Sequence, residues 1–517
     1  MRIDTQAGPL TRRRFLEHLG AIGGSSLVIG AMSSWDMMAA SAGQRPELSG
    51  RPANAKVVVL GAGLSGLVAA YELGRLGYDY RVLEARDRVG GLQWSVRRGS
   101  THTEVGGEKQ TCTFDDGQYV NVGPWRIPAA HEGVLNYCKE LGVPVEVFLN
   151  ESDANYFFYE GNAAGPLSNR RVRLREVKAD LTGQVNELLV KALDKHTLDL
   201  PLTAEDQDRL KAFLVRQGYL DSTSGAYKAF DIRGEGNPYA LADLLRAGFG
   251  NRLRSVSPTE GTTAGMVFQP VGGMDQISKA FQRAMGPGRI TFNADVQSVR
   301  QSETGVTVTY RDTGSGKTTE LRADYAIVAM PLNIVSALDI NLSDELMKAV
   351  KDVTYSNSAK IGLAMRRRFW EEDDQIFGGH LYSNLPIGEF SYPSNGYFTK
   401  KGVLLGLYSN GPIGNLIDQP VAARVEHVLA HASKVHPQIR AEFESGYAVF
   451  WKKVPYNLGG YASGRNVERR KALAKMDNRI VIGSAATAPK SEPDWQEGAV
   501  AAGWQALKTV HERAMHG

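Results

Sequence analysis

A strand, a glycine-rich loop and a helix near residue 60 constrain the fold of this chain more than any other feature. Residues 57–60 (VVVL) form a short apolar run, typical of a strand buried on both faces. Gly61, Gly63 and Gly66 follow in the spacing G-x-G-x-x-G. The first glycine permits a tight turn, the second lets a pyrophosphate approach the backbone, and the third lets helix and strand pack closely. The motif predicts a dinucleotide at the N-terminus of the helix, where free N–H groups and the helix dipole favour an anion.

The segment after this loop completes the expected unit. Apolar residues continue at helical spacing until Gly77, and a second strand, YRVLEA, leads to Glu84, which lies 23 residues beyond Gly61. A carboxylate at this place binds a ribose hydroxyl and argues against NADP, whose 2′-phosphate favours an arginine. FAD and NAD stay open on this motif alone, and a turn that binds no nucleotide is the remaining alternative. We find no second dinucleotide loop, which an NAD(P)H-dependent flavoenzyme usually needs.

Length and composition exclude several other classes of protein. The 517 residues exceed a single core and predict about two or three structural units. A net charge of +4 is too small for the basic face of a nucleic-acid-binding protein, and no stretch past residue 50 has the 18 apolar residues of a transmembrane helix. The histidines form no HExxH pair, so we expect no metal site. Cys112 and Cys138 allow one disulfide at most, and we expect two inert thiols.

The first 45 residues have the pattern of an export signal. Arg12, Arg13 and Arg14 precede Phe15 and Leu16, a mildly apolar glycine-rich run follows, and small residues suited to cleavage lie near residues 40–43. This is typical of a twin-arginine signal over residues 1–45, with a disordered basic tail as the alternative. Because this route exports folded proteins, it predicts a periplasmic or secreted protein with a tightly held cofactor.

The rest of the chain alternates between helical and strand patterns. Residues 170–215 are expected to be helical, with a capping box at Thr203 and Asp206. From residue 266 a loop and helix lead into alternating strands, and residues 477–486 (DNRIVIGSAA) are predicted to hold the last parallel strand before a closing helix. One face of the first predicted helix carries Leu181, Val185, Leu188, Leu189, Ala192 and Leu193.

Nearly the whole chain after residue 50 resembles the flavin monoamine oxidase superfamily, and within it the L-amino-acid oxidases. The resemblance is carried by EARDRVGG after the second strand and then, in order, by GPWRIP, SAKIGLAMRRRFWEED, GVLLGLYSNG, WKKVPYNLGGY and EPDWQEGAVAAG. It implies FAD as the cofactor and a mixed α/β fold, in which a Rossmann-like FAD-binding domain of the glutathione-reductase type accompanies a substrate domain and a helical insertion. The expected domains are FAD-binding at 51–92, 266–340 and 470–517, substrate-binding at 93–160 and 341–469, and the insertion at 161–265.

The resemblance assigns four side chains to the reaction. Arg126 of GPWR corresponds to the arginine that binds the substrate carboxylate, for which a guanidinium offers two parallel N–H donors. Tyr408 would give the carboxylate another donor, and Lys360 corresponds to the lysine that, as a cation, holds a water at flavin N5. Trp495 corresponds to an aromatic wall over the reacting carbon. The alternatives are an ion pair for Arg126, core packing for Tyr408 and Trp495, and an exposed strand position for Lys360.

Three departures from the family pattern bear on the cofactor. GGLQW replaces GGR, so a cation is missing and Gln93 is a candidate replacement. Gly483-Ser484 replaces Gly-Glu, which predicts a weaker contact to the ribityl chain. The only histidine of the insertion, His196, is not assigned the entrance role that some relatives give one. The resemblance places these residues at FAD: Gly61, Gly63, Leu64, Ser65, Gly66, Glu84, Ala85, Arg86, Gly91, Leu92, Gln93, Gly123, Pro124, Trp125, Arg126, Val296, Trp451, Gly483, Ser484, Asp494, Trp495, Gln496 and Ala499.

The implied activity is oxidative deamination of L-amino acids. A neutral substrate amine and a held carboxylate would let a hydride pass from Cα to FAD; water would convert the imino acid to a 2-oxo acid and ammonia, and O₂ would be reduced to hydrogen peroxide. A tryptophan-type monooxygenase that releases an amide, a simple amine oxidase and a non-catalytic flavin-binding protein are the alternatives. Asp494 is either a helix N-cap or a pocket residue that favours polar or cationic side chains. The preferred side chain and the oligomeric state, with a homodimer as one alternative, stay open.

Overall fold

The computed structural model describes residues 45–50, 55–195, 203–229, 237–249, 266–411, 414–463, 466–488 and 495–516. The expected export signal, His196 and Asp494 therefore lie outside the described residues, apart from residue 45 of the signal. The chain divides into two compact units, of which the first comprises Met1–Ala39, Leu149–Gly265 and Trp370–Leu385. The second comprises Ala40–Phe148, Met266–Phe369 and Pro386–Gly517. The predicted domain boundaries stay a prediction, since compactness alone does not define them.

A six-stranded sheet forms the centre of the dinucleotide-binding part of the second unit. β1 is parallel to its neighbours β2 and β16, β12 extends the sheet beyond β2, and β26 extends it beyond β16. The prediction of a last parallel strand near residue 480 is confirmed, with β25 antiparallel to it at the edge. The strands, in sheet order, are β12 (Ile290–Thr291), β2 (Asp79–Leu83), β1 (Lys56–Leu60), β16 (Tyr325–Val328), β26 (Ile480–Ile482) and β25 (Met476–Asp477).

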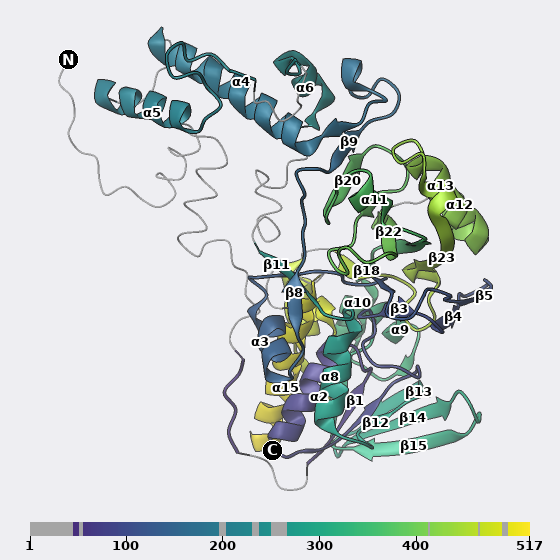
Figure 1. The fold of residues 1–517 in the computed structure, drawn as a ribbon. Coiled ribbons are helices and arrows are strands. Elements are labelled where there is room, and N and C mark those ends of the chain that lie inside the picture. Colours follow the sequence, from purple (N-terminus) through teal and green to yellow (C-terminus); the bar gives the residue numbers. More distant parts are fainter. Residues whose placement is uncertain are drawn as a thin grey trace, which may run out of the picture. The chain divides into compact units, whose positions relative to one another are not determined.

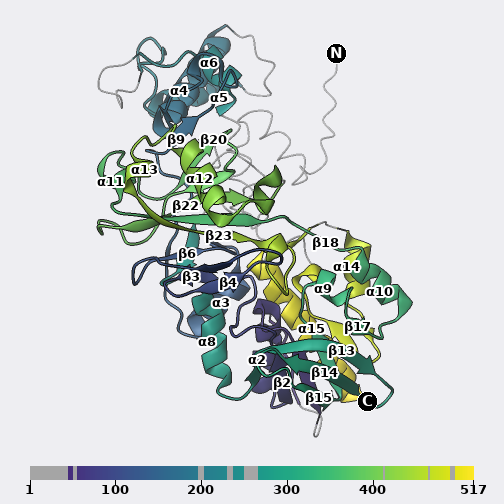
Figure 2. The same ribbon diagram turned by 90° about the vertical axis from the view of Figure 1, so that its right-hand side faces the viewer.

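The two faces of this sheet belong to different cores, which explains the continuous apolar run of β1. Val57 and Val59 pack in one cluster and Val58 and Leu60 in the other, since successive strand residues face opposite sides. Four helices cover the first face and lie together in Figure 1: α2 (Leu64–Arg75), α3 (Glu132–Glu140), α8 (Asp275–Met285) and α15 (Gln496–His516). The second face carries β13 (Ala294–Gln301), β14 (Val306–Asp312), β15 (Thr318–Ala323), β17 (Asp339–Ile340), α9 (Leu332–Val335), α10 (Asp344–Lys351) and α14 (Val467–Leu473), which Figure 2 shows together.

Helix α15 also stabilises the beginning of α3. The side chain of the N-cap residue His131 makes no capping hydrogen bond. Instead, the buried carboxylate of Glu497 accepts from the N–H groups of Gly133 at 2.8 Å and Val134 at 3.0 Å. Two of the N–H groups that a helix leaves without an internal partner are thereby satisfied from a distant part of the chain.

The second unit also contains an antiparallel sheet that carries several predicted site residues. Its strands follow the order β21-β22-β19-β23, and β19 is buried along its whole length. Helix α12 (Val421–Ala432) packs on it. These strands are β21 (Glu389–Ser391), β22 (Gly402–Ser409), β19 (Ala359–Met365) and β23 (Phe443–Phe450); shorter pairings join β3 (Ser95–Arg97) to β6 (Tyr119–Asn121), β4 (Thr101–Thr103) to β5 (Lys109–Thr111), β18 (Thr354–Tyr355) to β24 (Ala462–Ser463), and β11 (Val267–Pro270) to both β7 (Ile127–Pro128) and β8 (Val145–Val147).

The first unit is built on helices and a few short strands. The capping box of Thr203 and Asp206 is confirmed at the start of α5. The apolar face expected for α4 is partly wrong, because Val185 and Leu188 are 46% and 54% exposed. Its buried face instead includes Asp180, whose carboxylate accepts from the hydroxyl of Tyr227 at 2.7 Å. The elements are β9 (Tyr156–Phe158), β10 (Val172–Arg173), β20 (His380–Ser383), α4 (Leu174–Asp194), α5 (Ala204–Arg216) and α6 (Leu241–Ala247).

A buried ion pair fixes the β4–β5 hairpin to α12, and its loss should destabilise the fold. Arg424 donates two 2.8 Å hydrogen bonds to Glu104, and both side chains are at most 4% exposed. Arg424→Ala would leave a carboxylate buried without its cation, so we expect the free energy of unfolding to fall by about 3–5 kcal/mol. Urea unfolding measures this loss. Arg440→Ala, which removes an exposed pair with Glu426, is the matched control and should change stability little; equal effects of the two variants would contradict this account.

Candidate active site

The glycine-rich loop after β1 has the geometry that a bound dinucleotide requires. Gly61 has a φ of +103°, and a Cβ placed on Gly66 would lie 2.1 Å from the carbonyl oxygen of Gly61. Only glycine fits at these two positions. A Cβ on Gly63 would meet no atom within 4 Å, and no side chain caps the N-terminus of α2 there. The open side at Gly63 and the uncapped N–H groups fit a pyrophosphate.

Glu84 lies against this loop, as expected for a ribose acceptor. Its carboxylate is buried and accepts from the N–H of Ala62 at 2.8 Å and from the N–H of Arg86 at 3.0 Å. These bonds leave acceptor capacity on both oxygens, which suits a ribose hydroxyl. The guanidinium of Arg86 donates to the carbonyl of Pro455 and, at 2.5 Å, to Asn457. Arg86 therefore connects the segment after β2 to the loop that contains Pro455 and Asn457.

Gln93, the candidate replacement for a family cation, connects three elements of the fold by hydrogen bonds, and its contact to FAD stays a prediction. Its carbonyl accepts from the hydroxyl of Ser278 on α8, and its amide donates to Gln496 on α15 at 2.6 Å. Gln496 in turn donates to the carbonyl of Arg126 at 3.4 Å. The chain of hydrogen bonds therefore reaches the backbone of the predicted carboxylate-binding residue.

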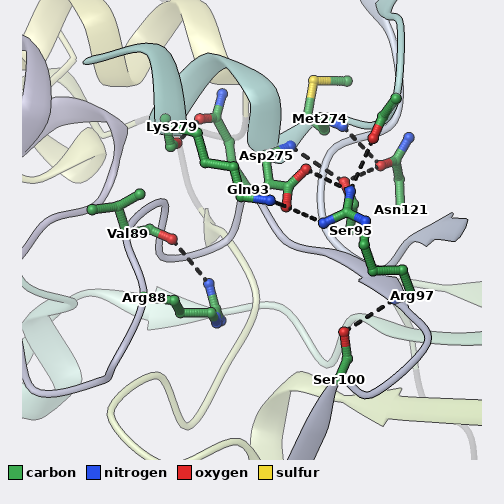
Figure 3. A network of polar contacts seen from close by, with 12 residues as sticks. Arg88, Val89, Gln93, Ser95, Arg97, Ser100, Asn121, Met274, Asp275 and Lys279 are labelled. Atoms are coloured by element: carbon green, nitrogen blue, oxygen red, sulfur yellow. Dashed lines mark hydrogen bonds and ion pairs between the residues drawn. The ribbon is translucent and has the colours of Figure 1, made fainter. Parts of the chain in front are cut away.

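The network in Figure 3 fixes the hairpin that leads into GPWR. Ser95 donates to the side-chain oxygen of Asn121 at 2.6 Å, and that oxygen accepts from the N–H of Met274 at 2.9 Å. Arg97 forms two hydrogen bonds, of 2.6 and 2.9 Å, with Asp275 at the beginning of α8. These contacts place the end of β6 next to the start of α8.

Lys360 is buried, which excludes the alternative of an exposed strand lysine. Its amine donates to the carbonyl oxygens of Gly123 at 2.5 Å and Asn121 at 3.3 Å. It lies 4.6 Å from the centre of the Trp125 ring and 4.5 Å from that of Tyr408. Burial lowers the pKa of Lys360 well below its usual value. The direction of this shift, which is caused by burial, opposes the cationic state that the family resemblance implies.

Arg126 lies close to two indole rings. Its guanidinium carbon is 5.4 Å from the centre of the Trp125 ring and 5.9 Å from that of Trp495, and the residue is 8% exposed. The Trp125 ring contacts Tyr408 edge-on, with ring centres 5.4 Å apart. The structure therefore brings Arg126, Lys360, Tyr408 and both indoles into one region, although they come from distant parts of the sequence.

Tyr408 remains protonated over a wide pH range. Burial raises the pKa of Tyr408 to about 12, while a hydrogen bond from Asn410 opposes the shift. The amide of Asn410 donates to the Tyr408 oxygen at 2.8 Å, so the hydroxyl keeps its own proton as a donor. Asn410 belongs to the GVLLGLYSNG segment that carries the resemblance, but the sequence assigned it no role of its own.

Other expected cofactor contacts have structural partners of their own. Trp451 donates to the carbonyl of Val122 at 2.7 Å and is 1% exposed, so it supports the strand before GPWR. The Ser484 side chain is hydrogen-bonded to Tyr355. Val296 lies at a register shift in β13. Their contacts to FAD stay a prediction.

The sequence and structure together place this chain in a known class of protein. Residues 64–510 match the family of flavin containing amine oxidoreductases, so the chain belongs to this family, and FAD is its cofactor. The L-amino-acid oxidase of Vipera ammodytes ammodytes is 30% identical over 377 residues, which cover 68% of this chain and 69% of the relative. The putative L-amino-acid oxidase YobN of Bacillus subtilis (strain 168) is 26% identical over 86% of this chain and 92% of the relative.

Solved structures confirm the predicted fold class. A putrescine oxidase with a redesigned cofactor-binding site has a TM-score of 0.59 and 19% identity, covering 89% of this chain and 99% of its own. Cyclohexylamine oxidase from Brevibacterium oxydans IH-35A has a TM-score of 0.59 and 16% identity, with the same coverage of the two chains. In the part of the chain that the structure describes, no helix is long and apolar enough to cross a membrane, and no group of three histidine, cysteine or acidic residues could hold a metal. Cys112 and Cys138 are buried free thiols.

Two glycine substitutions should separate cofactor binding from folding. Gly63→Ala adds a methyl group into open space, so we expect a folded protein that binds FAD at least about tenfold more weakly, because the pyrophosphate loses its close approach. Gly66→Ala should impair folding itself, because its Cβ meets the backbone of Gly61. Flavin absorbance per protein and thermal unfolding measure the two effects. Gly314→Ala, in a surface turn, is the control; an unchanged FAD affinity in Gly63→Ala would contradict the assignment.

The buried amine of Lys360 should give a defined pH dependence of stability. Its folded-state pKa lies below the usual 10.5, so between the two values the unfolded chain binds more protons than the folded one. The contribution of Lys360 to the free energy of unfolding therefore rises with pH in this window. We expect the stability of Lys360→Met relative to wild type to be highest at neutral pH and to fall as the pH approaches 10.5. Urea unfolding at several pH values tests this, and a constant difference would rule it out.

Proposed function

We propose that this protein oxidises L-amino acids to 2-oxo acids, with release of ammonia and hydrogen peroxide. The observation that carries the proposal is the buried guanidinium of Arg126 beside the hydroxyl-bearing ring of Tyr408, in the unit that also holds the dinucleotide loop. A cation shielded from water binds a carboxylate more strongly than an exposed one, because solvent screening is weaker. Two of the relatives are named L-amino-acid oxidases, one of them putatively, which supports the same activity.

The side chains around Arg126 can orient such a substrate. Arg126 offers two parallel donors to the carboxylate, and Tyr408, with its raised pKa, keeps its hydroxyl proton for a further hydrogen bond. The rings of Trp125 and Trp495 border the guanidinium and exclude water from it. When bound, FAD accepts the two electrons of the oxidation and passes them to O₂.

Lys360 is suited to handling a proton. Burial lowers the pKa of Lys360, which makes exchange of a proton with a neighbouring water easier, and the carbonyls of Gly123 and Asn121 hold the amine in place. A proton must leave the substrate ammonium before oxidation, since only the neutral amine has a lone pair to donate. We propose that Lys360 takes up this proton through a water molecule or holds that water in position.

A simple amine oxidase is the main competing activity, and products distinguish the two. The solved neighbours act on putrescine or cyclohexylamine by name, but at this identity their likeness concerns the fold. Anaerobic mixing with L-amino acids, D-amino acids and putrescine would be followed by flavin absorbance, and aerobic products by assays for 2-oxo acid, ammonia, peroxide and carboxamide. We expect L-amino acids to bleach the flavin and give 2-oxo acids. Bleaching by putrescine alone, or carboxamide as the product, would overturn the proposal.

Truncation of Arg126 should weaken oxidation of amino acids specifically. Loss of one partner from a desolvated charge pair costs about 2–5 kcal/mol. We therefore expect Arg126→Ala to lower kcat/KM by roughly 30-fold to several thousand-fold, at about 1.4 kcal/mol per tenfold. Arg126→Lys keeps the charge without the two parallel donors and should lose less. A loss under about threefold in Arg126→Ala would mean that the carboxylate binds elsewhere.

A further inference from the structure

One cross-strand row of the antiparallel sheet adds a carboxylate to this site. Glu389 on β21 is paired with Tyr408 on β22, and Tyr408 is paired with Lys360 on β19. Directly opposed residues of antiparallel strands project from the same face of a sheet. Glu389 therefore shares the face of Tyr408 and Lys360, two strand spacings or about 10 Å from the Lys360 backbone. Sequence analysis did not single it out.

The backbone before Glu389 is fixed closely against Tyr408. Gly388 has a φ of +61°, and a Cβ there would lie 2.2 Å from the carbonyl oxygen of Tyr408. Only glycine permits this approach, so Gly388 fixes the position of the Glu389 backbone relative to Tyr408. Glu389 itself is neither fully buried nor fully exposed.

Arg126 and Glu389 act on the same two groups with opposite sign. Arg126 lowers the pKa of both Lys360 and Tyr408, whereas Glu389 raises both values. The geometry agrees, because Glu389 is paired with Tyr408 and Arg126 lies against the Trp125 ring, which contacts both Tyr408 and Lys360. A substrate with its carboxylate at Arg126 would thus have an anionic group within reach of an extended side chain.

We propose that Glu389 forms a side-chain subsite that selects L-amino acids ending in a cation, such as lysine, ornithine or arginine. This inference rests on the proposed function. The side chains of lysine and arginine are long enough to carry a cation across a distance of about two strand spacings, the separation of Glu389 from the backbone of Lys360. A merely charge-balancing Glu389 would instead affect all substrates alike.

Substrate ratios in a neutral variant test this subsite. Glu389→Gln keeps the size of the side chain and removes its charge. We expect kcat/KM for L-lysine and L-arginine to fall at least about tenfold relative to L-norleucine, which has the same carbon stem as lysine without the ammonium. Glu389→Lys should reverse the preference and favour L-glutamate over L-lysine. Glu444→Gln, on β23 of the same sheet and paired with Lys401, should leave every ratio unchanged.

A binding measurement avoids dependence on turnover. α-Methyl-lysine lacks the Cα–H and cannot be oxidised, so its stabilisation of the FAD-loaded protein against heat reports binding alone. We expect it to raise the unfolding temperature of wild type more than that of Glu389→Gln, with α-methyl-norleucine acting equally on both. An unchanged lysine-to-norleucine ratio, or an equal loss for both substrates, would overturn the inference. A wild-type protein that oxidises no L-amino acid, norleucine included, would instead overturn the proposed function.

Discussion

The hydrogen bonds from Lys360 to the carbonyl oxygens of Asn121 and Gly123 are the contact on which the rest of the site depends. A buried amine requires such acceptors, and here they are backbone atoms of the segment that leads into Arg126. The same segment packs directly on the loop after β2, because a Cβ on Gly123 would lie 1.7 Å from the carbonyl oxygen of Leu92. The antiparallel sheet, the loop after β2 and the guanidinium of Arg126 are thus located relative to one another by one short stretch of backbone.

The cofactor-binding half of the fold could be predicted from sequence because its signals are local. The apolar run of β1, the glycines after it and the acidic end of β2 all lie within one strand–helix–strand unit, and the structure confirms each. The burial of α4 could not be predicted from apolarity alone. Asp180 lies on the buried face of α4 because its carboxylate accepts a hydrogen bond from Tyr227, whereas Val185 is exposed. A hydrogen bond between residues distant in sequence determines which face of α4 is buried, and the spacing of apolar residues cannot predict such a bond.

Resemblance pointed to Arg126, Lys360 and Tyr408, which the structure places close together, while their roles stay a prediction. The lowered pKa of Lys360 could not be predicted from sequence, since it results from burial of the amine. Glu389 was missed for a different reason. Its place beside Tyr408 follows from strand register, which is set by the close approach of Gly388, and no spacing in the chain encodes that pairing. A side chain placed by strand pairing can be recognised as a neighbour of the site only when the pairing of the strands is known.

The capping of α3 by Glu497 has a consequence for biosynthesis. β1, the loop and α3 precede β26 and α15 in the chain and are therefore synthesised first, although β26 extends the sheet and α15 caps α3. The sheet and the capped helix therefore cannot be complete until α15 has been synthesised.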